Sequence, residues 1–215
     1  AYGWRWKNPT DQIASLINLL RRDPGTRQAV LSMWSPDLDG AEARSSDRPC
    51  NTHIYLRLAN DGLDMTVCNR SNDMVWGMLG ANAVHMTFLH ELIASATDLP
   101  LGWYRVFSNN LHVYTGMPRF EELSQTTGAH DPYNLIHPFP LLWGGESYLD
   151  LMDDCECLVA GKEMVPRTKW MNDVAEPMYQ AYLDKDYRDK GIQRIAADDW
   201  RLACEQWNGR RNADR

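Results

Sequence analysis

The sequence lacks any apolar run that approaches the roughly 18 residues of a membrane-spanning helix. It also lacks the apolar stretch behind a basic start that marks a secretory signal peptide, because its first ten residues, AYGWRWKNPT, mix aromatic, charged and polar side chains. The sequence therefore predicts neither a membrane partner nor a secretory leader, and we expect a cytoplasmic protein.

Positive charge is scarce. The chain has 22 Lys and Arg residues against 29 Asp and Glu, a formal net charge of −7. Sequence-independent binding of nucleic acid needs a cationic surface, so we expect no nucleic-acid partner. An anionic ligand would have to be held by a few arginines at defined positions.

Cysteines are also few. The chain has five, and this odd number predicts free thiols in a reducing compartment. Cys155 and Cys157 could form half of a thiolate metal site, but no second cysteine pair accompanies them, and we predict no metal. Cys50 ends a polar loop before a predicted strand. It is either a small buried apolar residue or a nucleophile that a neighbouring cation activates.

Helical and strand patterns alternate along the first half of the chain. We predict a helix over 10–22 capped by Thr10, and a hairpin of 53–58 and 63–69 with an Asn-Asp-Gly turn. A loop over 70–80, a buried helix over 82–97 and a strand over 103–114 follow. This pattern is typical of the α+β class.

The composition changes near residue 115. Turn-forming residues dominate from there to 149, and two or three amphipathic helices are predicted from Lys169 onward, with Pro177 inside the first. We therefore predict a core over 1–115. The predicted remainder, 116–215, is a divergent C-terminal part with a helical tail, in the same domain.

Polar side chains suited to ligand binding follow the hairpin. Arg70 and Ser71 offer a guanidinium and a hydroxyl to phosphate oxygens. The amide of Asn82 can pair with the edge of a pyrimidine, although helix capping explains it equally well. His112 and Tyr114 would share one face of a strand and could hold a sugar hydroxyl, or simply form a half-buried strand face.

Taken jointly, these segments resemble thymidylate synthase and its relatives, the deoxynucleotide hydroxymethylases. The matching pieces are AYGWRW, the helix before DPGT, DPGTRQAVLSMW, PCN, NRSNDMVWG, GANAVHMTFL, DLPLGWY and LHVY. Their order and spacing hold across about half of the chain. The resemblance implies the α+β fold of thymidylate synthase, with a mixed or antiparallel sheet packed on a long buried helix, and a homodimer.

The resemblance also implies roles for individual residues. Cys50 would be the catalytic nucleophile, and Arg70 would activate it and bind phosphate. The other implied contacts are Ser71 to phosphate, Arg27 to the phosphate of the partner subunit, Asn82 to the base, His112 and Tyr114 to the sugar hydroxyl, and Asp73 and Trp76 to the folate.

The implied enzyme transfers a one-carbon group from 5,10-methylenetetrahydrofolate to C5 of a pyrimidine deoxynucleotide monophosphate. We favour dUMP, because the dCMP enzymes tend to carry aspartate in place of Asn82. The C-terminal part resembles phage-type hydroxymethylases, which slightly favours hydroxymethylation in a bacterial or phage-infected cytosol. Thymidylate synthesis is the first alternative, and a non-catalytic nucleotide-binding relative is the second.

Some positions depart from the family pattern. Gln28 stands where a second arginine is usual, Asn51 follows the nucleophile in place of histidine, and one extra residue lies between Gly77 and Asn82. We also expect the N-terminal segment of the family to be missing ahead of residue 1.

Overall fold

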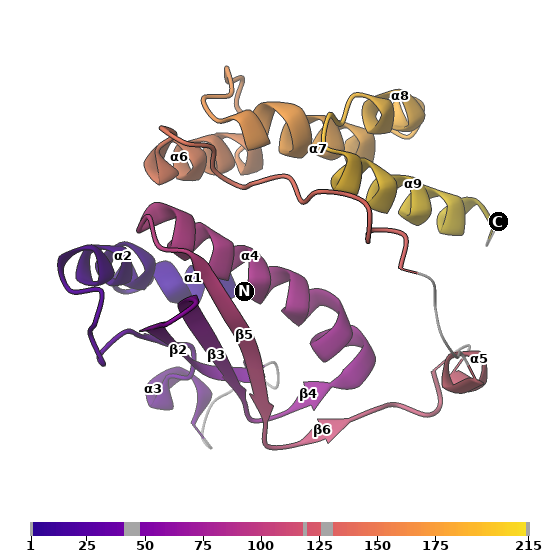
Figure 1. Cartoon of the computed structure of the whole chain (residues 1–215). Coiled ribbons are helices and arrows are strands. Elements are labelled where there is room, and N and C mark those ends of the chain that lie inside the picture. Colours follow the sequence, from indigo (N-terminus) through magenta and orange to yellow (C-terminus); the bar gives the residue numbers. More distant parts are fainter. Residues whose placement is uncertain (1, 41–47, 118–119, 126–130, 214–215) are drawn as a thin grey trace. The chain divides into compact units, whose positions relative to one another are not determined.

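The computed structural model describes residues 2–40, 48–117, 120–125 and 131–213. The chain forms two compact units, residues 1–125 and 126–215 (Figure 1). The change in composition predicted near residue 115 lies shortly before the division between these units.

The first unit contains the sheet. Its elements are α1 (Tyr2–Lys7), α2 (Gln12–Arg22), β1 (Val30–Ser32), α3 (Pro36–Asp39), β2 (Asn51–Ala59), β3 (Gly62–Asn69), β4 (Asn72–Asp73), the π-helix η1 (Met74–Ala81), α4 (Asn82–Ala96), β5 (Leu101–Ser108), β6 (Leu111–His112) and α5 (Phe120–Gln125).

The main sheet has the strand order β1-β2-β3-β5. Strands β1, β2 and β3 run antiparallel, whereas β3 and β5 run parallel, so the predicted mixed sheet is confirmed. The predicted hairpin turn is also present, and Ala59 pairs with Gly62 at its end. Gly62 has a φ of 145°, and a Cβ there would lie 2.6 Å from the carbonyl oxygen of Pro100, so this tight turn requires glycine.

Helices α2 and α4 cover one face of the sheet (Figure 1). Ile17 and Leu20 of α2, and Met86 and Ile93 of α4, are fully buried, which confirms the long buried helix. The predicted cap at Thr10 is wrong. Asp11 accepts the hydrogen bond from the Ala14 N–H instead, and its carboxylate suits the positive end of the helix dipole.

The opposite face of the sheet carries exposed aromatic side chains and also the charged side chains of Arg57, Asp64 and Arg105. In β5 alternate side chains face outward, and Trp103 and Phe107 are 62% and 66% exposed. Arg105 lies between them and donates a 2.7 Å hydrogen bond to Asp64. Tyr55 on β2 adds a third exposed ring to this face.

Two predicted segments differ from the structure. The predicted loop over 70–80 contains β4 and η1, and the predicted strand over 103–114 breaks at Asn109-Asn110 into β5 and β6. The break occurs because β6 leaves the main sheet and pairs in parallel with β4, which aligns Asp73 with His112.

The second unit is helical, as the predicted tail required. It contains α6 (Tyr148–Val159), η2 (Met171–Ala175), α7 (Glu176–Leu183), α8 (Arg188–Gln193) and α9 (Asp198–Ala213). Pro177 is the second residue of α7, which directly continues η2, and the carbonyl of Asp173 four residues earlier accepts the N–H of Ala196 instead. The sequence did not predict α6. No described helix of either unit combines the length and apolar character needed to cross a bilayer.

Candidate active site

The β2-β3 hairpin brings Cys50 and Arg70 together. Cys50 is half-buried directly before β2, and Arg70 directly follows β3, so the two residues flank the open end of the hairpin. The Arg70 N–H donates to the carbonyl of Cys50 at 2.9 Å, and its guanidinium donates to the carbonyls of Pro49 and Arg48, each at 3.0 Å. Arg70 also lies over the ring of Trp34. The guanidinium is therefore fixed beside the backbone that carries the predicted nucleophile.

Tyr2 joins this pair, although sequence analysis gave it no role. Burial raises the pKa of the Tyr2 phenol, against the opposing effect of hydrogen bonds from the backbone N–H groups of Asn51 and Cys50. The charges of Cys50 and Arg70 also act on this phenol. The signal was available, because Tyr2 belongs to the matching segment AYGWRW.

Helix α1, which carries Tyr2, is held by a bidentate ion pair. Arg5 donates to the two carboxylate oxygens of Asp39 at 2.6 and 2.7 Å, and also to the carbonyl of Met33. Burial acts to raise the pKa of Asp39, but the hydrogen bonds from Arg5 and from the Ser35 N–H outweigh it and hold the pKa below its ordinary value. The carboxylate thus ties α1 to α3.

We expect Asp39→Asn to lower the free energy of unfolding by up to about 3–5 kcal/mol, because it leaves the Arg5 guanidinium without its charged partner. The pKa of Asp39 is lowered in the folded state, so this stabilisation is present above the ordinary carboxylate pKa of about 3.9 and is lost as the pH falls through the folded value. Urea unfolding at pH 7 and at low pH measures both effects. An equal difference between variant and wild type at both pH values would contradict the prediction.

The β4-β6 pairing gathers the next predicted residues. The Ser71 hydroxyl lies 3.5 Å from Nδ1 of His112, at the limit of a hydrogen bond. The rings of His112 and Tyr114 pack edge to face with their centroids 5.1 Å apart. Tyr114 lies beyond the end of β6, yet the predicted pair is together. The structure therefore brings a hydroxyl, an imidazole and a phenol into one group.

Asp73 caps the start of η1, and Trp76 in this helix has an exposed ring. One carboxylate oxygen of Asp73 accepts the backbone N–H of Trp76, while the other is buried with no hydrogen-bond partner among the residues that the structure describes. The indole of Trp76 is 72% exposed. A flat heterocycle fits the exposed indole, because it could stack on that ring.

Asn82 is the first residue of α4, but its side chain makes no cap. Its amide nitrogen donates instead to the amide oxygen of Asn72 at 3.1 Å. The helix-capping alternative is therefore wrong. Gly77 packs against this pair so closely that a Cβ would lie 2.2 Å from the Asn72 oxygen and 3.0 Å from the Asn82 nitrogen.

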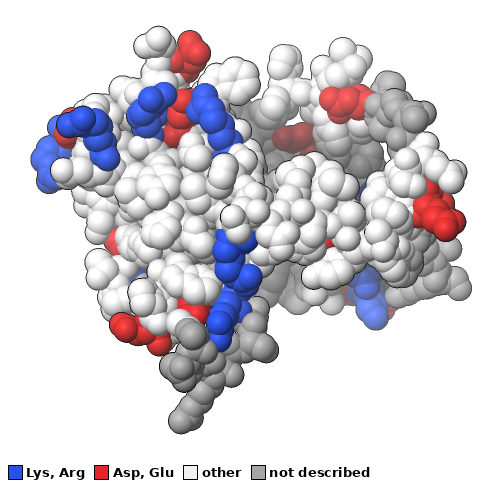
Figure 2. Space-filling model, turned by 90° about the horizontal axis from the view of Figure 1, so that it is seen from below, with Lys and Arg blue, Asp and Glu red and all other residues white. Residues whose placement is uncertain are grey.

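Arg27 stands apart from these groups. It is exposed in the bend between α2 and β1, and within the described ranges its side chain makes no hydrogen bond or ion pair. Lys and Arg side chains on the face shown in Figure 2 also form a few separate groups, with uncharged side chains between them. No continuous cationic surface covers that face.

Three of the other cysteines have less reactive thiols. Burial raises the pKa of Cys68 and of Cys204, and it raises that of Cys155 to about 11 with help from the neighbouring acidic residues. Within the described part of the chain, no three His, Cys, Asp or Glu side chains gather as metal ligands.

We expect iodoacetamide to alkylate Cys50 before Cys68, Cys155 and Cys204, because only the thiolate reacts and burial disfavours the thiolate at those three positions. Limited labelling followed by peptide mapping measures the order. Equal rates at Cys50 and Cys68 would contradict the prediction.

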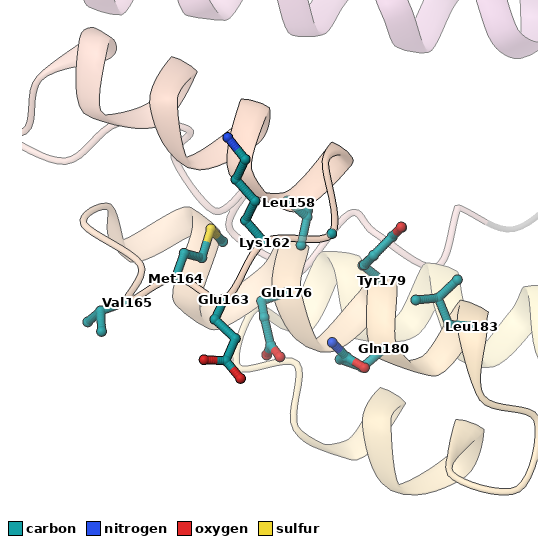
Figure 3. Close-up of a pocket in the computed structure, with 10 residues that line it drawn as sticks. Leu158, Lys162, Glu163, Met164, Val165, Glu176, Tyr179, Gln180 and Leu183 are labelled. Carbon is teal, nitrogen blue, oxygen red and sulfur yellow. The ribbon is translucent and has the colours of Figure 1, made fainter.

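The helical unit has a cavity of its own, of about 680 Å³. Leu158, Met164, Tyr179 and other residues of this unit line it, and none of the predicted site residues does. Lys162 points away from the carboxylates of Glu163 and Glu176 (Figure 3). The cavity therefore presents no cluster of charges directed at one point.

Comparison with known proteins agrees with this geometry. The family model described as thymidylate synthase matches residues 1–136. A deoxyuridylate hydroxymethyltransferase of Pseudomonas phage M6 is 33% identical over 99% of this chain and 66% of its own length. The enzyme of the same name from Bacillus phage SP01 is 38% identical over 50% of this chain and 28% of its own length.

Thymidylate synthases are also similar. That of Clostridium beijerinckii is 31% identical over 66% of this chain and 51% of its own length. The solved thermostable thymidylate synthase A of Bacillus subtilis is 29% identical, with a TM-score of 0.46 over 54% of this chain and 39% of that chain. The chain spans 66% or less of the length of each of these relatives. Since the family model covers more than half of it, the chain belongs to the thymidylate synthase family.

Proposed function

We propose that this protein transfers a one-carbon unit to C5 of dUMP and releases 5-hydroxymethyl-dUMP. The observation that carries the proposal is the position of Arg70, whose backbone and guanidinium hydrogen bonds hold it beside Cys50 at the end of the hairpin. Ser71, Asp73 and Asn82 lie in the segment that follows. The names of the phage relatives support the same reaction. A non-catalytic role is less consistent with a retained nucleophile, cation and base-binding amide.

In the proposed reaction the nucleotide is held first. Ser71 and the exposed guanidinium of Arg70 bind the phosphate, and His112 with Tyr114 binds the sugar hydroxyl. The thiolate of Cys50 then adds to C6 of the pyrimidine, which makes C5 nucleophilic. After C5 has gained the carbon and lost its proton, the bond between C6 and sulfur breaks and the thiolate is released. Covalent catalysis of this kind divides one difficult step into easier ones.

Trp76 would hold the folate by stacking on its exposed indole, and Asp73, which fixes the backbone of Trp76, would support this contact. When bound, 5,10-methylenetetrahydrofolate supplies a carbon at the oxidation level of formaldehyde. The raised pKa of Tyr2 keeps its phenol protonated at neutral pH, so Tyr2 would hold a proton beside Cys50 and the pyrimidine ring.

Water and hydride lead to different products. Addition of water to the transferred carbon gives hydroxymethyl, whereas hydride from tetrahydrofolate would give methyl, the thymidylate synthase outcome that the bacterial relatives' names suggest. Incubation with C5-tritiated dUMP and methylenetetrahydrofolate, with product analysis by mass, tests the proposal. Tritium release with a hydroxymethyl product supports it, a methyl product shifts it to the synthase, and no release in the presence of bound nucleotide favours a non-catalytic relative.

We also propose a homodimer in which the sheet face with the exposed rings of Tyr55, Trp103 and Phe107 is covered by a second copy and Arg27 binds the partner's phosphate. Arg27 is exposed and uncommitted within its own described surroundings, which suits a role in trans.

Mixing equal amounts of Arg27→Ala and Cys50→Ala chains should then restore up to about a quarter of the wild-type activity. Half of the randomly paired dimers are heterodimers, and each heterodimer has one complete site out of two. Tritium release after confirmed subunit exchange is the measurement, and each variant alone is the control. No recovery would exclude the role of Arg27 in trans.

A further inference from the structure

The side chain of Asn82 is hydrogen-bonded to a second, buried amide, that of Asn72. Asn72 is 1% exposed, and its backbone N–H is held by the carbonyl of Asn110 at 2.9 Å. Its side-chain oxygen accepts the N–H of Asn82 at 3.1 Å, and its side-chain nitrogen donates to the hydroxyl of Ser108 at 3.3 Å. The side chain that meets the base is therefore anchored by a second, buried amide.

Gly77 determines which atom of the Asn72 amide, oxygen or nitrogen, faces Asn82. The Asn72 oxygen lies only 2.2 Å from the place where a Cβ of Gly77 would stand. A carbonyl oxygen tolerates such a close approach to a Cα and its hydrogens, whereas an NH₂ group would point its own hydrogens at them. The contact therefore favours the oxygen of Asn72, not its nitrogen, on the side of Gly77 and Asn82.

The orientation of the Asn72 amide determines which donor and acceptor atoms of Asn82 remain available to a ligand. An amide has two N–H donors and one acceptor oxygen. With one N–H bound to Asn72, the other N–H and the oxygen remain for a ligand. If the Asn82 amide turned over, its oxygen would face the oxygen of Asn72, and two acceptors would repel each other.

Resting on the proposed function, we propose that Asn72 is a positioning residue that makes the site specific for uracil over cytosine by fixing the amide of Asn82. Uracil offers an N3–H donor and an O4 acceptor, which match the free oxygen and N–H of the anchored amide. Cytosine offers an acceptor at N3 and an amine at C4, so it needs the amide turned over. Gly77 and Ser108 support the arrangement, the first by its lack of a side chain and the second by its hydroxyl.

The test compares dUMP and dCMP in wild type and variants, by calorimetric binding and by competitive tritium release. We expect Asn72→Ala to reduce the preference for dUMP by at least about tenfold, mainly through improved dCMP binding, because the Asn82 amide is then free to turn over. Asn72→Asp keeps an acceptor oxygen toward Asn82 and should retain the preference. Asn60→Ala, the same change in the exposed hairpin turn, is the matched control and should leave the preference unchanged.

If Asn72 had a merely structural role, Asn72→Ala would weaken the binding of dUMP and dCMP equally and leave the ratio of their affinities unchanged. That result would overturn the proposal. If Asn72→Ala does not fold, Asn72→Asp still decides, since loss of the preference in that variant is incompatible with an anchoring acceptor. Wild type that binds neither nucleotide would refute the proposed function, and this inference with it. Wild type that prefers dUMP while Asn72→Ala keeps the same preference would refute only the inference.

Discussion

Replacement of Cys50 by alanine is expected to reduce tritium release from C5-labelled dUMP by about 10⁴-fold or more, the scale seen when a covalent nucleophile is removed. Without the sulfur no bond forms at C6, and C5 remains a poor nucleophile. Binding of dUMP should change by only a few-fold, because the phosphate and base contacts come from Arg70, Ser71 and Asn82. Competitive binding measured beside the rate assay separates the two effects.

Cys68→Ala is the matched control, since Cys68 is also a half-buried thiol, on the strand that pairs with β2. It should retain nearly full activity. A second readout is the covalent adduct with 5-fluoro-dUMP and folate, which should appear by mass in wild type and in Cys68→Ala and be absent in Cys50→Ala. An adduct that survives in Cys50→Ala would remove Cys50 from its proposed role.

The second large effect is expected at the base. Asn82→Asp should narrow or invert a preference for dUMP over dCMP that we predict to be at least about tenfold in wild type. An aspartate, protonated or acting through water, matches the cytosine edge better than the uracil edge. A buried polar edge left unpaired costs about 1–3 kcal/mol, which is one to two decades in affinity. Tritium release from labelled dUMP and dCMP in competition measures the ratio.

Asn60→Asp, the same chemical change in the exposed hairpin turn, provides the control and should leave the ratio untouched. Phosphate binding should also persist in Asn82→Asp, as inhibition by inorganic phosphate can show. If wild type releases tritium from dCMP as readily as from dUMP, Asn82 does not select the base.

The part of the site that local signals could predict is the hairpin end. The Asn-Asp-Gly turn fixes the register of β2 and β3, and that register sets Cys50 beside Arg70. The buried helix that begins at Asn82 was equally predictable, because apolar residues recur throughout it and Pro100 lies shortly beyond its end. These features depend on neighbours in the sequence.

The remainder depends on contacts between distant segments. The pairing of β4 with β6 joins residues nearly forty positions apart, and no local period announces a two-residue strand. The bond between Asn72 and Asn82 requires the π-helix between them, which propensities do not predict. Tyr2 reaches Cys50 only because Arg5 and Asp39 fix α1.

The same π-helix also determines how a change in chain length just before α4 can be accommodated. The N–H of Asn82 donates to the carbonyl of Gly77, five residues earlier, and Gly80 inside this turn leaves helical geometry. A turn closed in this way contains one residue more than an α-helical turn between the same ends. The one extra residue that the resemblance implies between Gly77 and Asn82 fits this local bulge, and the closing hydrogen bond fixes the start of α4. Deleting Gly80 would shorten the bulge to an ordinary turn and keep Asn82 in phase, whereas deleting a residue inside α4 would rotate every later side chain by about 100°.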